Sequence, residues 1–338
     1  MAGGSSSPVV TPPTARRGQT SLAFHRGKSL QAISARTTFL YTHAPVQVSV
    51  IIPTFNRREL VCEAIRSVLA QRLTAPTDVE VIVVDDGSTD GTVDCLRATF
   101  GQDIRLEALR ENRGVAAARN AGASIARGTW LAFLDSDDLW KPQKLAFHLA
   151  FAERYAFAIS QTEEVWIRQG RFVNPCRYHR KPEGDIFLAS LERCLVSPSA
   201  VLIHRDLWAR HGGFDPSLPA CEDYDLWLRI ACEEPVGLLR KPLVIKRGGH
   251  DDQLSRRFWG MDRFRVASLL RVLFTCPLDA RRAHAVLRVL ERKCAILANG
   301  AAKRHRFEEA ERYRAVATAA RDYVEERWPV SSSRGAAA

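Results

Sequence analysis

The 338-residue chain lacks several patterns that define common classes of protein. No apolar run approaches the roughly 18 residues that a membrane-spanning helix needs, and no N-x-S/T glycosylation acceptor occurs. Its eight cysteines contain no C-x-x-C pair, so neither a zinc ribbon nor a disulfide framework is indicated. We therefore expect reduced thiols and a soluble, cytoplasmic protein.

Two nucleotide-binding signatures are also missing. No G-x-G-x-x-G follows the first apolar strand, and G-x-x-x-x-G-K-S/T occurs nowhere, so the dinucleotide-binding and P-loop classes lose their main support. The segment 86–91 superficially resembles a calcium loop. It does not qualify as one, because Arg97 occupies the twelfth position, where a bidentate Glu is needed.

Acidic residues are absent from the first 47 positions, which hold five Lys or Arg. Residues 251–338 carry 18 basic and 11 acidic side chains, whereas residues 48–250 carry 26 and 27. The formal charge of +11 therefore belongs to the two tails. This distribution favours peripheral contact with an anionic membrane or partner over a nucleic-acid partner.

Residues 1–46 are rich in Gly, Ser, Thr, Pro and Arg, and such a composition cannot bury a core of its own. We expect a disordered N-terminal extension. Its composition is typical of an organelle transit peptide, and a plain disordered tail or an extension from an upstream start codon are the alternatives. Organelle import therefore stays open.

From Val46 onward, apolar strands alternate with helical patterns. The expected strands lie at 48–52, at 81–84 and in the run that ends at Leu134. The expected helices lie at 60–71, in a short segment that carries Val93, Leu96 and Phe100, and at 115–125. This order predicts an α/β domain with a mostly parallel sheet, in which ligands bind at the carboxyl ends of the strands. A further strand is expected at 200–203 and a helix at 222–230. After His250 the pattern is helical, with segments near 264–274, 280–297 and 308–324.

Three carboxylates follow the strand that ends at Leu134, in the segment Asp135-Ser136-Asp137-Asp138. If the backbone stays extended there, Asp135 and Asp137 point the same way, roughly 6 to 7 Å apart. Such a pair is favourable when Mg²⁺ or Mn²⁺ lies between the oxygens, together with substrate phosphates. The alternative is that Asp137 or Asp138 caps a helix near Lys141.

Five segments, in this order, resemble the motifs of family 2 glycosyltransferases, which are inverting enzymes of GT-A fold. They are Val48–Asn56, Val84–Thr92, Asn112–Asn120, Asp135–Asp138 and Glu222–Trp227. The resemblance covers roughly residues 47 to 250. It implies a Rossmann-like, mostly parallel sheet in a GT-A domain over 47–255, followed by a helical C-terminal extension over 256–338.

The resemblance also implies a nucleotide site. Phe55 should stack on the nucleobase, with Pro53 and Thr54 lining that pocket. Asp86 should accept a hydrogen bond from the base, most simply from N3 of uracil, and Arg119 should approach the base or the phosphates.

The remaining roles concern the diphosphate and the sugar. The resemblance implies that Asp135 contacts the ribose, that Asp137 holds the metal ion, and that Asp223, within the Glu222-Asp223 pair, is the catalytic base. His250 is placed as a late metal ligand or phosphate contact, and a surface histidine in a Gly-rich loop is the alternative.

These expectations define a glycosyltransferase that depends on Mn²⁺ or Mg²⁺. It should move a sugar from a nucleotide sugar, most simply a UDP-sugar, to a hydroxyl acceptor in glycan, polysaccharide or glycolipid synthesis. The acceptor stays open between a glycan, a lipid-linked molecule and a small molecule. Asp225 is a rival base, but in a helix it faces away from Asp223. The other classes that stay open are a sugar nucleotidyltransferase and a non-catalytic carbohydrate-binding scaffold.

Overall fold

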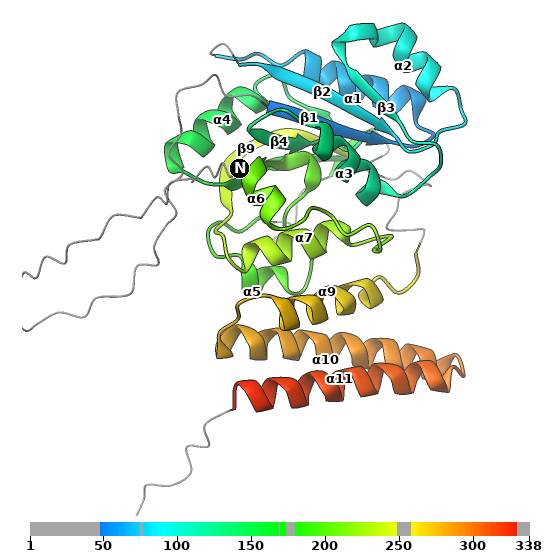
Figure 1. Cartoon of the computed structure of the whole chain (residues 1–338), viewed down its shortest axis with the longest axis vertical. Helices are drawn as coiled ribbons and strands as arrows, with labels where there is room; N and C mark the ends of the chain where they lie inside the picture. Colours follow the sequence, from blue (N-terminus) through cyan, green and yellow to red (C-terminus); the bar gives the residue numbers. More distant parts are fainter. Residues whose placement is uncertain (1–47, 75–76, 169, 174–179, 249–257, 330–338) are drawn as a thin grey trace, which may run out of the picture. The chain divides into compact units, whose positions relative to one another are not determined.

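The structure is a computed structural model that describes residues 48–74, 77–168, 170–173, 180–248 and 258–329 (Figure 1). The expected N-terminal extension and His250 lie outside the described residues.

The described strands form one mixed sheet in the order β3-β2-β1-β4-β8-β6-β9-β5, with β7 beside β6. The strands are β1 (Val48–Thr54), β2 (Val79–Asp85), β3 (Arg105–Ala108), β4 (Trp130–Phe133), β5 (Leu139–Trp140), β6 (Ile159–Arg168), β7 (Arg171–Val173), β8 (Val201–His204) and β9 (Gly237–Gly248). The strands from β3 to β4 pair in parallel, and β8 is antiparallel to both of its neighbours, β4 and β6. The carboxyl ends of β1, β2 and β4 therefore meet at one edge of the sheet.

Helices cover both faces of this sheet and continue beyond it. They are α1 (Arg58–Leu69), α2 (Thr92–Phe100), α3 (Val115–Ile125), α4 (Lys144–Tyr155), α5 (Phe187–Ser190), α6 (Arg205–Arg210), α7 (Glu222–Ala231), α9 (Asp262–Thr275), α10 (Ala280–Lys303) and α11 (Phe307–Arg327). Within the described residues, short 3-10 turns occur at Gly101–Asp103 and Pro198–Ala200.

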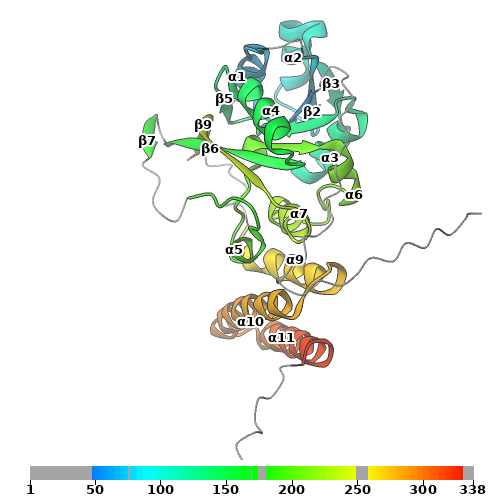
Figure 2. The same cartoon turned by 90° about the vertical axis from the view of Figure 1, so that its left-hand side faces the viewer.

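The alternation of side chains along β1 divides the core into two layers. Val50 and Ile52 belong to the apolar cluster that contains α1, α2 and α4, and Figure 2 shows these helices gathered on one side of the sheet. Ile51 points the other way, toward α3. A Cβ on Gly122 of α3 would lie 2.6 Å from the Ile51 side chain, so α3 can approach β1 this closely only at a glycine.

The expected strands and helices of the first half are confirmed, with ends that differ by a few residues. The three helical segments expected after His250 correspond to α9, α10 and α11. Helix α9 contacts α7 and α10, and α10 packs along α11 (Figure 1). The expected fold class, a mostly parallel sheet with a C-terminal helical region, is therefore confirmed.

Candidate active site

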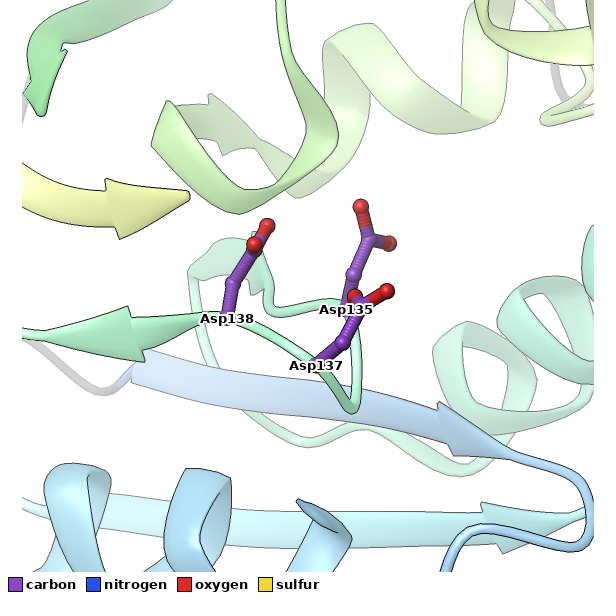
Figure 3. Close-up of side chains that lie close together, drawn as sticks. All are labelled: Asp135, Asp137 and Asp138. Carbon is purple, nitrogen blue, oxygen red and sulfur yellow. The ribbon is translucent and has the colours of Figure 1, made fainter. Parts of the chain in front are cut away.

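The aspartate-rich segment after β4 is a tight turn. Strand β4 ends at Phe133, and the Asp138 N–H donates to the Asp135 carbonyl oxygen at 3.0 Å, which is the hydrogen bond of a β-turn. The backbone is therefore not extended here, and the expectation that depended on an extended backbone was wrong. The turn nevertheless gathers the carboxylates of Asp135, Asp137 and Asp138 on one side (Figure 3), with one oxygen of each within 4.8 Å of the others.

Asp138 is buried and its oxygens are already occupied. It accepts from Ser199 Oγ at 2.5 Å and from the Arg247 N–H at 3.1 Å, and it pairs with Lys246 Nζ at 2.6 Å. The helix-capping alternative was wrong, because the two residues after Asp138 form strand β5 and α4 begins only at Lys144. Asp138 therefore fastens the turn to β9 and to the segment before β8.

Of the three aspartates in this turn, Asp137 has the carboxylate that is most available to bind a cation. The contact described for its side chain is Arg57 Nη1 at 3.0 Å, and the side chain is 13% exposed. Mg²⁺ and Mn²⁺ prefer a few carboxylate oxygens completed by phosphate and water, and Asp137 can offer such an oxygen without breaking a buried network. The residues present therefore fit a divalent cation, to which Asp137 could offer a direct ligand oxygen.

Arg119 links Asp135, in the turn after β4, to Glu222 of helix α7. Its guanidinium pairs with Asp135 Oδ1 and with Glu222 Oε1, both at 2.7 Å, and lies 5.0 Å above the Phe214 ring. Burial alone would raise the pKa of Asp135, but Arg119 and Lys246 hold it well below its usual range. Asp135 is therefore ionised, and Arg119 and Lys246 together fix its position. Arg119 is itself already paired with two carboxyl groups, those of Asp135 and Glu222.

Helix α7 presents Glu222 and Asp223 in its first turn. The residue before them, Cys221, has φ +63, a left-handed conformation that non-glycine residues adopt at a cost of about 1 to 3 kcal/mol and mostly at functional sites. Burial and the neighbouring Asp223 carboxylate raise the pKa of Glu222 to about 7. Cys221 therefore leads into the N-terminus of α7, which is the positive end of the helix dipole, and the neighbouring carboxyl groups of Glu222 and Asp223 lie there.

The carboxylate of Asp223 lies beside two donor groups. Oδ1 accepts from the Tyr224 N–H at 2.7 Å, and Oδ2 lies 3.4 Å from Cys194 Sγ. Burial and the Asp223 charge raise the pKa of the Cys194 thiol, so the sulfur is protonated. Its single hydrogen has two acceptors, Asp223 Oδ2 and the Val196 carbonyl oxygen, which lies 3.1 Å from the sulfur.

Asp223 and Asp135 line the same cavity, which has a volume of about 300 Å³. Arg119, Lys246, Trp166 and Cys194 also line it. The residue expected to act as the base and the residue expected at the ribose thus line one space.

The residues expected at the nucleobase lie at the ends of β1 and β2. Asp86 is buried and accepts the Arg113 and Gly114 N–H groups, each at 2.8 Å, and its burial raises its pKa. Gly87 has φ +78, and a Cβ there would lie 2.7 Å from the Glu111 backbone, so the turn needs a glycine in order to close on that segment.

Phe55 is 36% exposed, whereas Pro53 and Thr54 are buried. The Oγ1 atom of Thr54 is buried without a hydrogen-bond partner among the described residues. Next to Phe55, the Asn56 N–H donates to Ser88 Oγ at 2.8 Å, which ties the two loops together. An exposed ring on a braced loop can stack on a base without a rearrangement.

Asp225 is directed away from the cavity, as the helical spacing predicts. It is fully buried, and its Oδ2 pairs with Arg229 Nε and Arg271 Nη1, each at 3.0 Å. Arg271 comes from α9 and also pairs with Asp215. Asp225 therefore joins α7 to α9.

Replacing Asp225 by Asn should lower the free energy of unfolding by about 3 kcal/mol, because two guanidinium groups lose a buried anionic partner. Urea titration would measure the change. Asp206→Asn, an exposed aspartate on α6 with its side chain 71% exposed, is the control and should change stability by less than about 0.5 kcal/mol. Equal urea midpoints for the two variants would contradict this role.

The sequence motifs do not include three residues that contact the site: Arg57, Cys194 and Lys246. Lys246 lies on β9, where it pairs with Asp135 at 3.4 Å and Asp138 at 2.6 Å. Asp138 and Asp135 raise the pKa of Lys246 despite its burial. No motif marks these residues, and Lys246 reaches the turn because β9 pairs with both β5 and β6.

Solved structures of similar fold include two glycosyltransferases. S. aureus TarS 1-349 in complex with UDP-GlcNAc has a TM-score of 0.54 and 19% identity over 82% of this chain and 92% of that one. The mannosyltransferase PcManGT from Pyrobaculum calidifontis, in complex with GDP-Man and Mn²⁺, has a TM-score of 0.53 and 20% identity over 85% and 88%. The fold is thus that of the GT-A glycosyltransferases.

Sequence comparison identifies the family. Residues 49–204 match the model of Glycosyl transferase family 2. The UDP-Glc:alpha-D-GlcNAc-diphosphoundecaprenol beta-1,3-glucosyltransferase WfaP of Escherichia coli is 32% identical over 191 residues, which are 54% of this chain and 69% of that protein. The chain belongs to glycosyl transferase family 2.

Another relative is the uncharacterized glycosyltransferase RC0461 of Rickettsia conorii, which is 34% identical over 199 residues. The match covers 58% of this chain and 32% of that protein, so the chain spans about a third of the length of this relative.

None of the helices that the structure describes combines the length and the apolar character required to cross a bilayer.

Proposed function

We propose that the protein transfers a sugar from a nucleotide sugar to a hydroxyl acceptor with inversion at the anomeric carbon. The observation that supports this most directly is the shared cavity, because Asp223, Asp135 and Arg119 all line one space of about 300 Å³. A sugar attached to a diphosphate at the Asp135 side would lie between the leaving group and the base.

In the proposed reaction, the acceptor oxygen attacks the anomeric carbon and Asp223 takes the hydroxyl proton. The bond between the anomeric carbon and the diphosphate oxygen breaks, and the nucleoside diphosphate leaves on the opposite face with the electron pair. Asp135 holds the ribose end, with Arg119 and Lys246 fixing its orientation. When bound at Asp137, Mn²⁺ or Mg²⁺ would supply positive charge against the leaving diphosphate.

We propose a UDP-sugar as the donor and a polysaccharide or glycolipid precursor as the acceptor. The E. coli relative is named for a UDP-Glc donor and a diphosphoundecaprenol acceptor, and the TarS and PcManGT structures hold UDP-GlcNAc and GDP-Man. Asp86 favours uracil in this proposal, because each of its oxygens keeps a lone pair beyond its backbone hydrogen bond.

The full chain should be screened with UDP-Glc, UDP-GlcNAc and GDP-Man, each with a lipid-linked diphosphate sugar as the hydroxyl acceptor, in Mn²⁺, in Mg²⁺ and in EDTA. We expect release of UDP from one of the UDP-sugars with either metal and none in EDTA, and a β-linked product from the α-linked donor by NMR. Equal turnover in EDTA would contradict metal dependence. Release of GDP alone would contradict the uridine assignment, and an α-linked product would contradict inversion.

Replacing Phe55 by Ala should weaken UDP binding by about 1 to 3 kcal/mol, the amount typical for loss of an aromatic stacking partner. Calorimetry in Mn²⁺ would measure the change. Phe172→Ala is the matched control, because this phenylalanine is 75% exposed on β7 and has no assigned role. If the two variants bind UDP equally, the nucleobase does not lie on Phe55.

A further inference from the structure

An aromatic and basic surface lies where the start of α9 meets the turn between α10 and α11. We call it the Trp259 patch, and its members are Trp259, Arg263, Lys303, Arg304, Arg306 and Phe307. Figure 1 shows α10 and α11 side by side and joined by a short turn. That turn brings Arg304 and Arg306 to the indole of Trp259.

Three guanidinium groups surround one exposed indole. The Cζ atoms of Arg263, Arg304 and Arg306 lie 4.9, 5.2 and 5.6 Å from the Trp259 ring centre. Trp259 is 48% exposed and Phe307 is 63% exposed. Cations held around exposed aromatic rings give a surface that is both positively charged and apolar.

The charge of the patch is largely unbalanced. Arg306 pairs with Glu309 at 3.6 Å, and Glu308 follows Phe307 in the sequence. Within the described part of the chain, Arg263, Lys303 and Arg304 form no ion pair with a carboxylate. The nearby Asp262 is already paired with Arg265 at 2.9 Å and with Lys293 at 3.0 Å.

We propose that the Trp259 patch docks the protein on the surface of an anionic phospholipid bilayer. Arginine and lysine are attracted to anionic headgroups, and Trp and Phe rings lie at the boundary between headgroups and acyl chains. The patch offers both signals at one place, which is the requirement for stable peripheral binding. If the proposed function holds, docking there would keep the protein at the surface in which its acceptors are anchored.

Vesicle flotation with the full chain tests this proposal, without any sugar donor. One set of vesicles contains phosphatidylcholine alone, and the other contains phosphatidylcholine with about a third phosphatidylglycerol. We expect binding to the anionic vesicles only, weakened by 0.5 M NaCl. Reversing Arg304 and Arg306 to Glu should lower that binding about tenfold or more, and Phe307→Ser should lower it several-fold at unchanged net charge.

The matched control reverses Arg97 and Arg240, which are exposed on α2 and β9, and therefore changes the net charge equally. It should bind the vesicles as the unmodified chain does. Both double variants should keep their metal-dependent affinity for UDP, which separates failure of this proposal from failure of the proposed function. If charge reversal impairs folding, the milder double variant Arg304→Gln with Arg306→Gln should be compared with the unmodified chain for vesicle binding.

Several outcomes would overturn the proposal. Equal binding to both kinds of vesicle would exclude anionic headgroups, and no binding to either would exclude a bilayer. Equal losses for the two double variants would assign the attraction to net charge, and unchanged binding by the Arg304 and Arg306 variant would assign it to another part of the chain. If the patch variants instead lose affinity for an RNA that the unmodified chain binds, while no vesicle is bound, the surface recognises nucleic acid.

Discussion

Replacing Asp223 by Asn is expected to lower kcat for sugar transfer by roughly 10² to 10⁴-fold, the usual contribution of a general base. Affinity for UDP in the presence of Mn²⁺ should stay near that of the unmodified protein. The amide keeps the shape of the carboxylate and can still accept the Tyr224 N–H, but it cannot take the proton of the acceptor. An interaction made only in the transition state lowers kcat without raising KM.

Glu222→Gln tests the other carboxylate of the pair. Glu222 is bound to Arg119 at 2.7 Å, so its loss should disturb the orientation of Arg119 and Asp135 and should raise KM for the donor. Transfer that survives in Asp223→Asn but is lost in Glu222→Gln would assign the base to Glu222. Full activity in both variants would contradict the base-assisted mechanism.

Replacing Asp137 by Ala is expected to remove the metal-dependent part of UDP binding and to lower kcat/KM by roughly 10³-fold, equivalent to several kcal/mol of charge stabilisation. The other two aspartates of the turn cannot compensate. Asp135 is committed to Arg119 and Lys246, and Asp138 is buried with Ser199, Lys246 and the backbone of β9. Calorimetry with UDP, in Mn²⁺ and in EDTA, measures the effect separately from turnover.

The Arg57 side chain complicates this test, because Asp137→Ala removes its partner at 3.0 Å. A freed guanidinium could itself bind the diphosphate. The double variant with Arg57→Ala removes that cation and should still lack any difference between Mn²⁺ and EDTA. If the double variant regains metal-dependent binding, Asp137 is not the ligand.

The sequence was sufficient to predict where the strands end and which polar residues follow them. This succeeded because β1, β2 and β4 are continuous apolar runs, and parallel strands place their carboxyl ends at one edge. Local patterns of this kind depend on side-chain period and need no tertiary information. The placement of Asp223 at the same site was implied by the resemblance to the family and not by side-chain period.

The detailed electrostatics of the site could not be predicted in this way. The backbone at Asp135 was expected to be extended, but a turn forms because the chain must reverse into β5, which pairs antiparallel with β9. The contact of Lys246 with this turn joins residues more than 100 positions apart. Cys194 likewise reaches Asp223 from a segment without regular structure. Such contacts arise from packing between elements, which periodicity does not encode.

The central claim, a metal-dependent nucleotide site built on Asp137, is tested most directly by a crystal structure of the full chain with UDP and Mn²⁺, with data collected at the manganese absorption edge. We expect one anomalous peak at about 2.1 to 2.2 Å from an Asp137 oxygen, close to the bond lengths of small octahedral divalent cations, with a diphosphate oxygen on its other side and the uracil stacked on Phe55. UDP bound with no manganese at Asp137, or manganese bound elsewhere in the chain, would contradict the claim.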